Sequence, residues 1–192
     1  VQDSAHPARM EVLHIPSGGV LINGVAYLAA GPGPHPTIVI CHGLPGNEKN
    51  LDLAQAVRRA GWNAITFNYR GSWGSPGSFR FAQNPEDAAA VLAYIRDSTN
   101  SKKLGIDTSH IVLAGHSMGG WVAAMTSAND ATLRGTILIS AANMGALGRM
   151  PRAEIMKEMA GDMESLFDTT PDAMTDEVVA SAQAFDFIGR AE

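Results

Sequence analysis

Residues 111–120 read IVLAGHSMGG and decide which fold the sequence predicts. The apolar run Ile111–Ala114 is typical of a buried strand, and an apolar helical pattern follows it through Trp121. Between the two lies a G-x-S-x-G pattern, which suits a sharp strand-to-helix turn that exposes the hydroxyl of Ser117. The backbones nearly touch at such a turn, and three glycines would relieve the crowding: Gly115, Gly119 and Gly120. The alternative is a glycine-bearing turn with an incidental serine.

Two backbone N–H groups are expected to face the space in front of this serine. Met118 would begin the helix, where N–H groups lack intrahelical partners and favour negative charge. The second turn, HGLPG at residues 42–46, follows another apolar run at residues 37–41. Gly43 would let the backbone approach, and Leu44 would supply the second N–H. Two such donors are what an oxyanion hole requires.

Strand and helix patterns alternate on both sides of the serine turn. Strands are expected at residues 10–15, 20–28, 37–41, 63–68, 110–114 and 136–140, and helices at residues 51–60, 84–97 and after residue 117. The first two strands would form a hairpin, and Asn84 would cap the helix at 84–97. Three strand–helix alternations after residue 36 predict an α/β fold with a mainly parallel, doubly wound sheet and helices on both faces.

The run FNYRGSWGSPG at residues 67–77 lies between the HGLPG turn and the GHSMGG turn in the sequence. With HGLPG and GHSMGG it makes the chain resemble the α/β-hydrolase superfamily, most closely serine hydrolases related to dienelactone hydrolase and prolyl oligopeptidase. The resemblance runs from about Met10 to Asn143. It implies Ser117 as the catalytic nucleophile, an acyl-enzyme intermediate, and a small-molecule acyl substrate.

The resembled family completes its triad with an acid and then a histidine after the serine. None of the six histidines lies after Ser117, so the triad histidine and acid are expected outside these residues. The aspartates near the end are expected to be solvated charges: Asp162, Asp168, Asp172, Asp176 and Asp186. His42 and His116 are the alternative bases within the chain, whereas His6, His14 and His35 are expected to have no catalytic role.

Composition narrows the class further. The 192 residues are 45% hydrophobic and 17% charged, and their net charge is −5. They contain no basic cluster, so a nucleic-acid partner is not expected. They contain no apolar run long enough for a membrane span, so none is expected. The single cysteine, Cys41, excludes an internal disulfide and a cysteine-rich zinc site. Phosphate-loop, G-x-G-x-x-G and H-E-x-x-H patterns are missing, so no cofactor or metal is expected. The first residue, Val1, fits a mature end or a cut boundary, which leaves a soluble cytoplasmic or exported location open.

The character of the sequence changes after residue 142. Residues 1–142 are expected to form the hydrolase core, and residues 143–192 a helical lid or cap with helices at 151–167 and 171–188. The apolar strand at 136–140 would be an open sheet edge, covered either by C-terminal strands from outside the chain or by a second copy.

Two functions remain in competition. The first is a serine hydrolase of carboxylic esters or related acyl compounds, acting through Ser117. The second is a catalytically inactive hydrolase-fold protein that serves as a binding or interaction module. A third alternative, a serine enzyme using His42 or His116 as its base, requires that one of them reach the hydroxyl.

Overall fold

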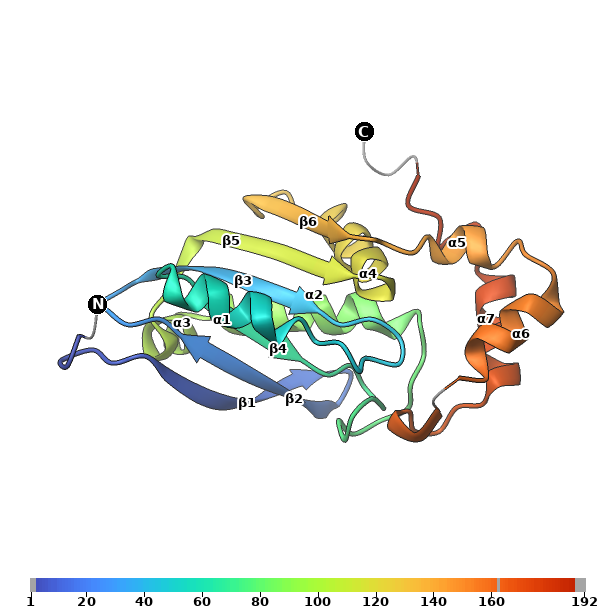
Figure 1. Cartoon of the computed structure of the whole chain (residues 1–192), viewed down its shortest axis with the longest axis horizontal. Helices are drawn as coiled ribbons and strands as arrows, with labels where there is room; N and C mark the ends of the chain where they lie inside the picture. Colours follow the sequence, from blue (N-terminus) through green and yellow to red (C-terminus); the bar gives the residue numbers. More distant parts are fainter. Residues whose placement is uncertain (1–2, 162, 189–192) are drawn as a thin grey trace.

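A computed structural model describes residues 3–161 and 163–188. All strands of this part of the chain form one six-stranded sheet in the order β1-β2-β4-β3-β5-β6 (Figure 1). The strands are β1 (Arg9–Ser17), β2 (Val20–Leu28), β3 (His35–Cys41), β4 (Asn63–Phe67), β5 (Ile106–His116) and β6 (Gly135–Ile139). Strands β4, β3, β5 and β6 run parallel, while β2 pairs antiparallel with both β1 and β4. The predicted mainly parallel sheet is confirmed.

The predicted hairpin is also confirmed, and it has a two-residue turn. Ser17 pairs with Val20, and Gly18 and Gly19 between them have φ values of 55° and 84°. Two consecutive residues at positive φ give the turn a twist that matches the twist of the flanking strands.

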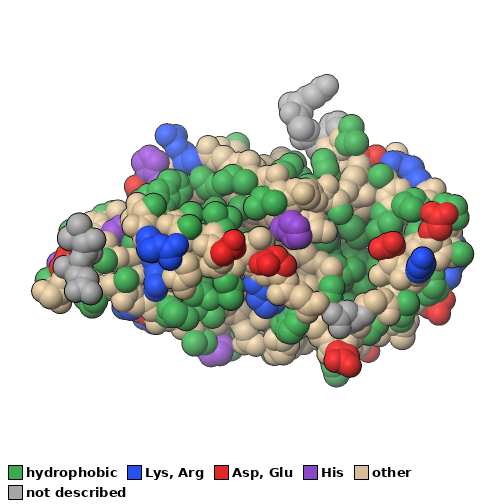
Figure 2. Space-filling model, viewed as in Figure 1, with side chains coloured by type: hydrophobic (Ala, Val, Ile, Leu, Met, Phe, Trp, Pro, Cys, Tyr) green, Lys and Arg blue, Asp and Glu red, His purple; other side chains and the backbone are tan. Residues whose placement is uncertain are grey.

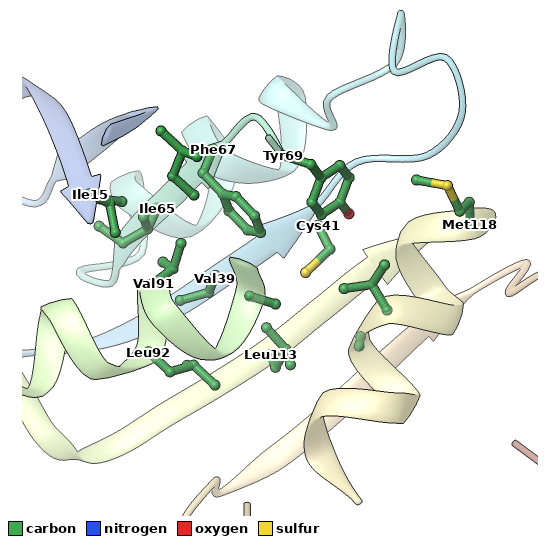
Figure 3. Packing of buried hydrophobic residues seen from close by; sticks show 14 of the residues in the cluster. Ile15, Val39, Cys41, Ile65, Phe67, Tyr69, Val91, Leu92, Leu113 and Met118 are labelled. Atoms are coloured by element: carbon green, nitrogen blue, oxygen red, sulfur yellow. The ribbon is translucent and has the colours of Figure 1, made fainter. Parts of the chain in front are cut away.

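Helices cover both faces of the sheet, as the sequence predicts. They are α1 (Leu51–Arg59), α2 (Gln83–Arg96), α3 (Ser98–Leu104), α4 (Met118–Ser127), α5 (Met144–Leu147), α6 (Arg152–Met159) and α7 (Pro171–Ala180), with a 3-10 turn η1 (Met163–Ser165). Helix α1 packs on one face through Ala54, while α2 and α4 close a larger core on the other. In that core Val91 and Leu92 of α2 lie close to Val39 and Leu113 of the sheet (Figure 3).

The predicted cap of α2 is wrong. The N-cap is Ala82, and Asn84 lies fully buried inside the first turn. Just before the helix, the backbone N–H groups of Phe81 and Ala82 donate to the Glu177 carboxylate of α7, at 3.1 and 2.8 Å. A carboxylate distant in the sequence therefore ties the turn before α2 to α7, and no local pattern could reveal this contact.

Helix α3 is not predicted from the sequence, although its signals are present. The Asp97 side chain accepts from the N–H groups of Thr99 and Asn100, and Gly105 ends the helix in the left-handed region with φ 63°. These are ordinary start and stop signals. The helix has only seven residues, too few for a clear apolar period.

The segment after β6 consists of short helices at the carboxyl end of the parallel strands (Figure 1). Its helices are shorter than the two expected at 151–167 and 171–188. The segment is tied to the core by backbone and side-chain hydrogen bonds: the Phe79 N–H donates to Phe167 O at 3.0 Å, and the Trp121 indole N–H donates to Phe185 O at 2.7 Å.

The aspartates of this segment have different environments. Asp168, Asp172 and Asp176 are largely exposed, as expected. The expectation is wrong for Asp186, whose side chain is only 19% exposed and pairs with Arg149 at 2.6 Å. Asp162 lies outside the described residues.

Strand β6 is an edge of the sheet formed by the described residues. Its Ile137 and Leu138 side chains are 44% and 45% exposed. Among residues 3–161 and 163–188, no helix is both long and apolar enough to cross a bilayer.

Candidate active site

Ser117 stands at the junction of β5 and α4 in an unusual backbone conformation. It is the N-cap of α4, with φ 54° and ψ −123°. Its N–H donates to Ile139 O at 3.0 Å, and its carbonyl accepts from Gly120, Trp121 and Ala142. A non-glycine residue at positive φ is strained, and such strain persists only where the surroundings hold it. Here β6 and α4 both hold it.

Close backbone contacts around Ser117 require glycine on both sides. A Cβ atom at Gly115 would overlap the carbonyl oxygen of Gly119, and one at Gly119 would overlap the carbonyl oxygen of Cys41. A Cβ at Gly43 would lie 3.3 Å from Ser117 Cβ and 3.8 Å from Met118 N. The turn after β3 therefore packs directly against the serine turn.

The N–H groups of Leu44 and Met118 are available at this junction. Met118 is the first residue of α4, where an N–H has no intrahelical partner. Within the described part of the chain, neither N–H takes part in a hydrogen bond. Leu44, Ser117 and Met118 line one cavity together. The free N–H groups at a helix start favour negative charge beside them.

Two cavities meet at Ser117. The larger, about 440 Å³, lies between the turns and the segment after β6, and Figure 2 shows hydrophobic side chains gathered between the sheet body and that segment. The smaller, about 240 Å³, includes Glu48 and His116 in its lining. Both share Leu44, Pro45 and Ser117.

His42 holds the turn after β3 in place. Its Nδ1 lies 2.7 Å from Gly43 O, and because a carbonyl only accepts, Nδ1 carries the proton. The Tyr69 hydroxyl donates to His42 O at 2.8 Å, and the two rings are 4.5 Å apart. Burial, aided by the charge of Lys49, lowers the pKa of His42 to about 3, so the ring is neutral at physiological pH.

The remaining histidines of the described chain make no hydrogen bond to the Ser117 hydroxyl. His116 lines the smaller cavity beside it, whereas His35 bonds Gly61 O and Gly31 O near the amino end of β3. The structure thus brings together Ser117, Leu44, Met118 and the predicted glycines, but it adds no base from residues 3–161 and 163–188.

Asn143 and Asp186 form a separate contact after β6. Asn143 caps α5 and donates through Nδ2 to Asp186 Oδ1 at 2.8 Å. This hydrogen bond and the Arg149 guanidinium lower the pKa of Asp186 to about 2. The pair joins the start and the end of the C-terminal segment.

Trp73 contacts two parts of the site, a role that is not predicted from the sequence. Its indole N–H donates to Pro45 O at 2.6 Å, and its backbone N–H donates to Ser165 O at 2.8 Å. The Lys49 ammonium lies 4.4 Å from the centre of the same ring. Trp73 therefore ties the turn that carries Leu44 to the segment after β6. Its place in the FNYRGSWGSPG run was the only signal in the sequence.

A buried ionic network behind the site was missed as well. Asp87 of α2, fully buried, accepts from Ser17 Oγ at 2.6 Å, from Arg70 N at 2.9 Å and from Arg70 Nε at 2.6 Å. The network fixes the loop after β4, which carries Trp73, to both α2 and the hairpin. Burial raises the pKa of Asp87, and the hydrogen bonds from Ser17 and Arg70 oppose that rise.

A serine on a strained strand-to-helix turn, at the carboxyl end of a mainly parallel sheet, defines the α/β-hydrolase class of fold. The sequence pattern of the alpha/beta hydrolase family matches residues 38–190. The chain belongs to the alpha/beta hydrolase family.

Comparison with individual proteins agrees with this assignment. An uncharacterized protein of Mycobacterium tuberculosis is 26% identical over 121 residues, which cover 62% of this chain and 41% of that protein. An esterase of Pyrobaculum calidifontis has a similar structure, with a TM-score of 0.62 and 23% identity over 93% of this chain and 62% of that one. A putative dienelactone hydrolase of Klebsiella pneumoniae gives a TM-score of 0.56 and 17% identity over 69% and 60%. The two structural likenesses show the fold, and the chain spans less than half of the curated relative.

Proposed function

We propose that the chain carries the nucleophile and oxyanion half of a serine hydrolase site for carboxylic esters or related acyl compounds. The observation that supports this most is the strained turn at Ser117, which packs against the turn of Gly43 and Leu44. Strain at a residue that lines two cavities is typical of a functional position.

The chemistry follows from these groups. As Ser117 Oγ bonds to the substrate carbonyl carbon, a general base takes the hydroxyl proton, and the N–H groups of Leu44 and Met118 stabilise the oxyanion. The intermediate collapses by breaking the bond to the alcohol, which leaves with the proton from the base. Water then cleaves the acyl-serine by the same steps. The base is proposed to be a histidine from outside the described residues, paired with an acid.

The segment 143–188 is proposed to act as a lid or cap over this site. Its side chains supply one wall of the larger cavity.

A binding module without catalysis is the second candidate. It is favoured by one observation: no histidine among the described residues bonds the Ser117 hydroxyl, and His42 is neutral and committed to Gly43 O. Without a base, a serine hydroxyl is a weak nucleophile at neutral pH.

Ester turnover separates the two candidates. The protein at its full encoded length should hydrolyse p-nitrophenyl acetate and butyrate, and Ser117→Ala should lower kcat/KM at least about a thousandfold. Equal rates for the two proteins would favour the binding module. His116→Gln and His42→Asn test the chain's own histidines as bases. Loss of turnover in a folded variant would identify the substituted histidine as the base, in place of one from outside the described residues.

A further inference from the structure

The two cavities at Ser117 differ in the chemistry of their walls. The larger one is lined mainly by thioether and aliphatic side chains, including Met144, Leu147, Met150 and Met159. Met144 and Met159 are 2% and 1% exposed, so this wall is part of the packed core of the segment. Methionine side chains adapt to apolar ligands of varied shape.

Neither cavity has, among its described lining residues, a lysine or an arginine that could pair with an anion. Among the described lining residues, the larger cavity has one ionisable side chain, Glu158, and the smaller has Glu48 and His116. Lys49 follows Glu48 in sequence, but its ammonium donates to Asn68 Oδ1 at 3.0 Å and lies over the Trp73 ring. A carboxylate on the substrate would therefore meet acidic neighbours and apolar walls, where desolvation is costly.

We propose that the site selects an uncharged ester with an apolar chain, which occupies the methionine-lined cavity, and a small polar remainder, which occupies the cavity of Glu48 and His116. Substrates with a carboxylate on the chain are rejected. This inference deepens the proposed function, but the selectivity belongs to the cavity and is measurable as binding without turnover.

Binding to the larger cavity can be observed at its own methionines. Protein labelled with ¹³C at the methionine methyl groups is titrated with 2-octanone, a neutral eight-carbon methyl ketone, and with 7-oxooctanoate, the same methyl ketone with a carboxylate at the far end of the chain. We expect 2-octanone to shift the methyl signals of Met144, Met150 and Met159, while those of Met10 and Met174 stay unchanged. 7-Oxooctanoate should bind at least about tenfold more weakly. Equal binding of the two probes, or shifts spread over all methionines, would overturn the proposal.

A change of charge gives a second test with a matched control. Met150 lines the cavity at 41% exposure, whereas Val179 on α7 is 44% exposed and is not among the lining residues. Met150→Lys should raise the affinity for 7-oxooctanoate relative to 2-octanone by about three- to tenfold, because it adds a cation to the cavity. Val179→Lys should leave the ratio unchanged. The same change in both variants would contradict the assignment of the cavity.

Kinetics decides whether the apolar chain is the acyl group or the alcohol. With p-nitrophenyl esters, kcat/KM should rise up to about fourfold per methylene from acetate to octanoate if the acyl group fills the cavity. With acetate esters of butanol to octanol, the same rise would assign it to the alcohol. Methionine shifts without turnover would leave the cavity selectivity standing and refute the hydrolase. Turnover with no dependence on either chain would refute the selectivity and leave the hydrolase standing.

Discussion

Around Ser117, the neighbouring glycines have no room for even one added methyl group. Gly119 faces the carbonyl of Cys41 at a distance that excludes a Cβ, and its neighbours there are backbone atoms, which cannot rotate away. Gly135, at the start of β6, has no atom within 4 Å of where its Cβ would stand. The two positions form a matched pair on connected elements.

We therefore expect Gly119→Ala to lower the free energy of unfolding by about 3 kcal/mol or more, and Gly135→Ala to change it by less than about 1 kcal/mol. Urea unfolding followed by tryptophan fluorescence measures both. Equal losses in the two variants would show that the turn relaxes around the added methyl group.

His42 predicts a pH dependence of stability. Its pKa falls from the ordinary 6.5 to about 3 in the folded chain because the ring is buried. Between these two values the unfolded chain binds a proton that the folded chain does not, so stability falls as the pH is lowered from about 6.5 towards 3. The slope from this group approaches about 1.4 kcal/mol per pH unit midway between the two pKa values.

His42→Asn keeps a side-chain N–H near Gly43 O but removes the titration. As the pH falls from 7 to 4, the free energy of unfolding should fall more in the wild type than in this variant. Parallel pH curves for the two proteins would place the His42 pKa near its ordinary value.

At the scale of elements, the loop after β4 depends on the buried Asp87. Asp87 and Glu86 both bond Arg70, but the Asp87 side chain is fully buried and that of Glu86 is 66% exposed. Removing one partner of a buried ion pair leaves an uncompensated charge and costs about 3 kcal/mol or more, whereas an exposed pair contributes about 1 kcal/mol or less.

Asp87→Ala should accordingly destabilise the protein by about 3 kcal/mol, and Glu86→Ala by under about 1 kcal/mol, as measured by chemical denaturation. Because the loop carries Trp73, Asp87→Ala should also quench or shift the tryptophan emission before global unfolding. Similar losses in the two variants would mean that Arg70 is held mainly by Glu86.

Elements with strong local signals could be predicted from the sequence, and those set by distant contacts could not. The hairpin, the parallel strands and the turn at Ser117 follow from apolar runs and glycines. The sequence predicts Asn84 as the cap of α2, but Asn84 is buried in the first turn, and the turn before the helix bonds Glu177, more than ninety residues away. The contacts of Trp73 and Asp87 are likewise long-range, so the sequence indicated the nucleophile turn but not the residues that support it.

At the scale of the whole molecule, β6 is an edge strand of the sheet that the described residues form, and it exposes apolar side chains. Ile137 and Leu138 lie on this edge without a charged residue in the strand. Unpaired N–H and C=O groups on an uncharged apolar edge favour pairing with another strand.

The 192-residue chain alone should therefore self-associate as its concentration rises, and Leu138→Lys should weaken the association at least about tenfold, since a charge on an edge opposes pairing. Val179→Lys, at a site of nearly equal exposure, should not. Sedimentation of all three proteins measures this. A wild-type chain that stays monomeric at every concentration would show that the edge needs no cover.

Covalent labelling of Ser117 tests the central claim most directly. The protein at its full encoded length is treated with a fluorophosphonate, digested, and the modified residue is located by mass spectrometry. We expect one adduct, on Ser117, and none in folded Ser117→Ala. A folded wild-type protein that leaves Ser117 unlabelled, or that carries the adduct on another residue, would contradict the assignment of Ser117 as the nucleophile.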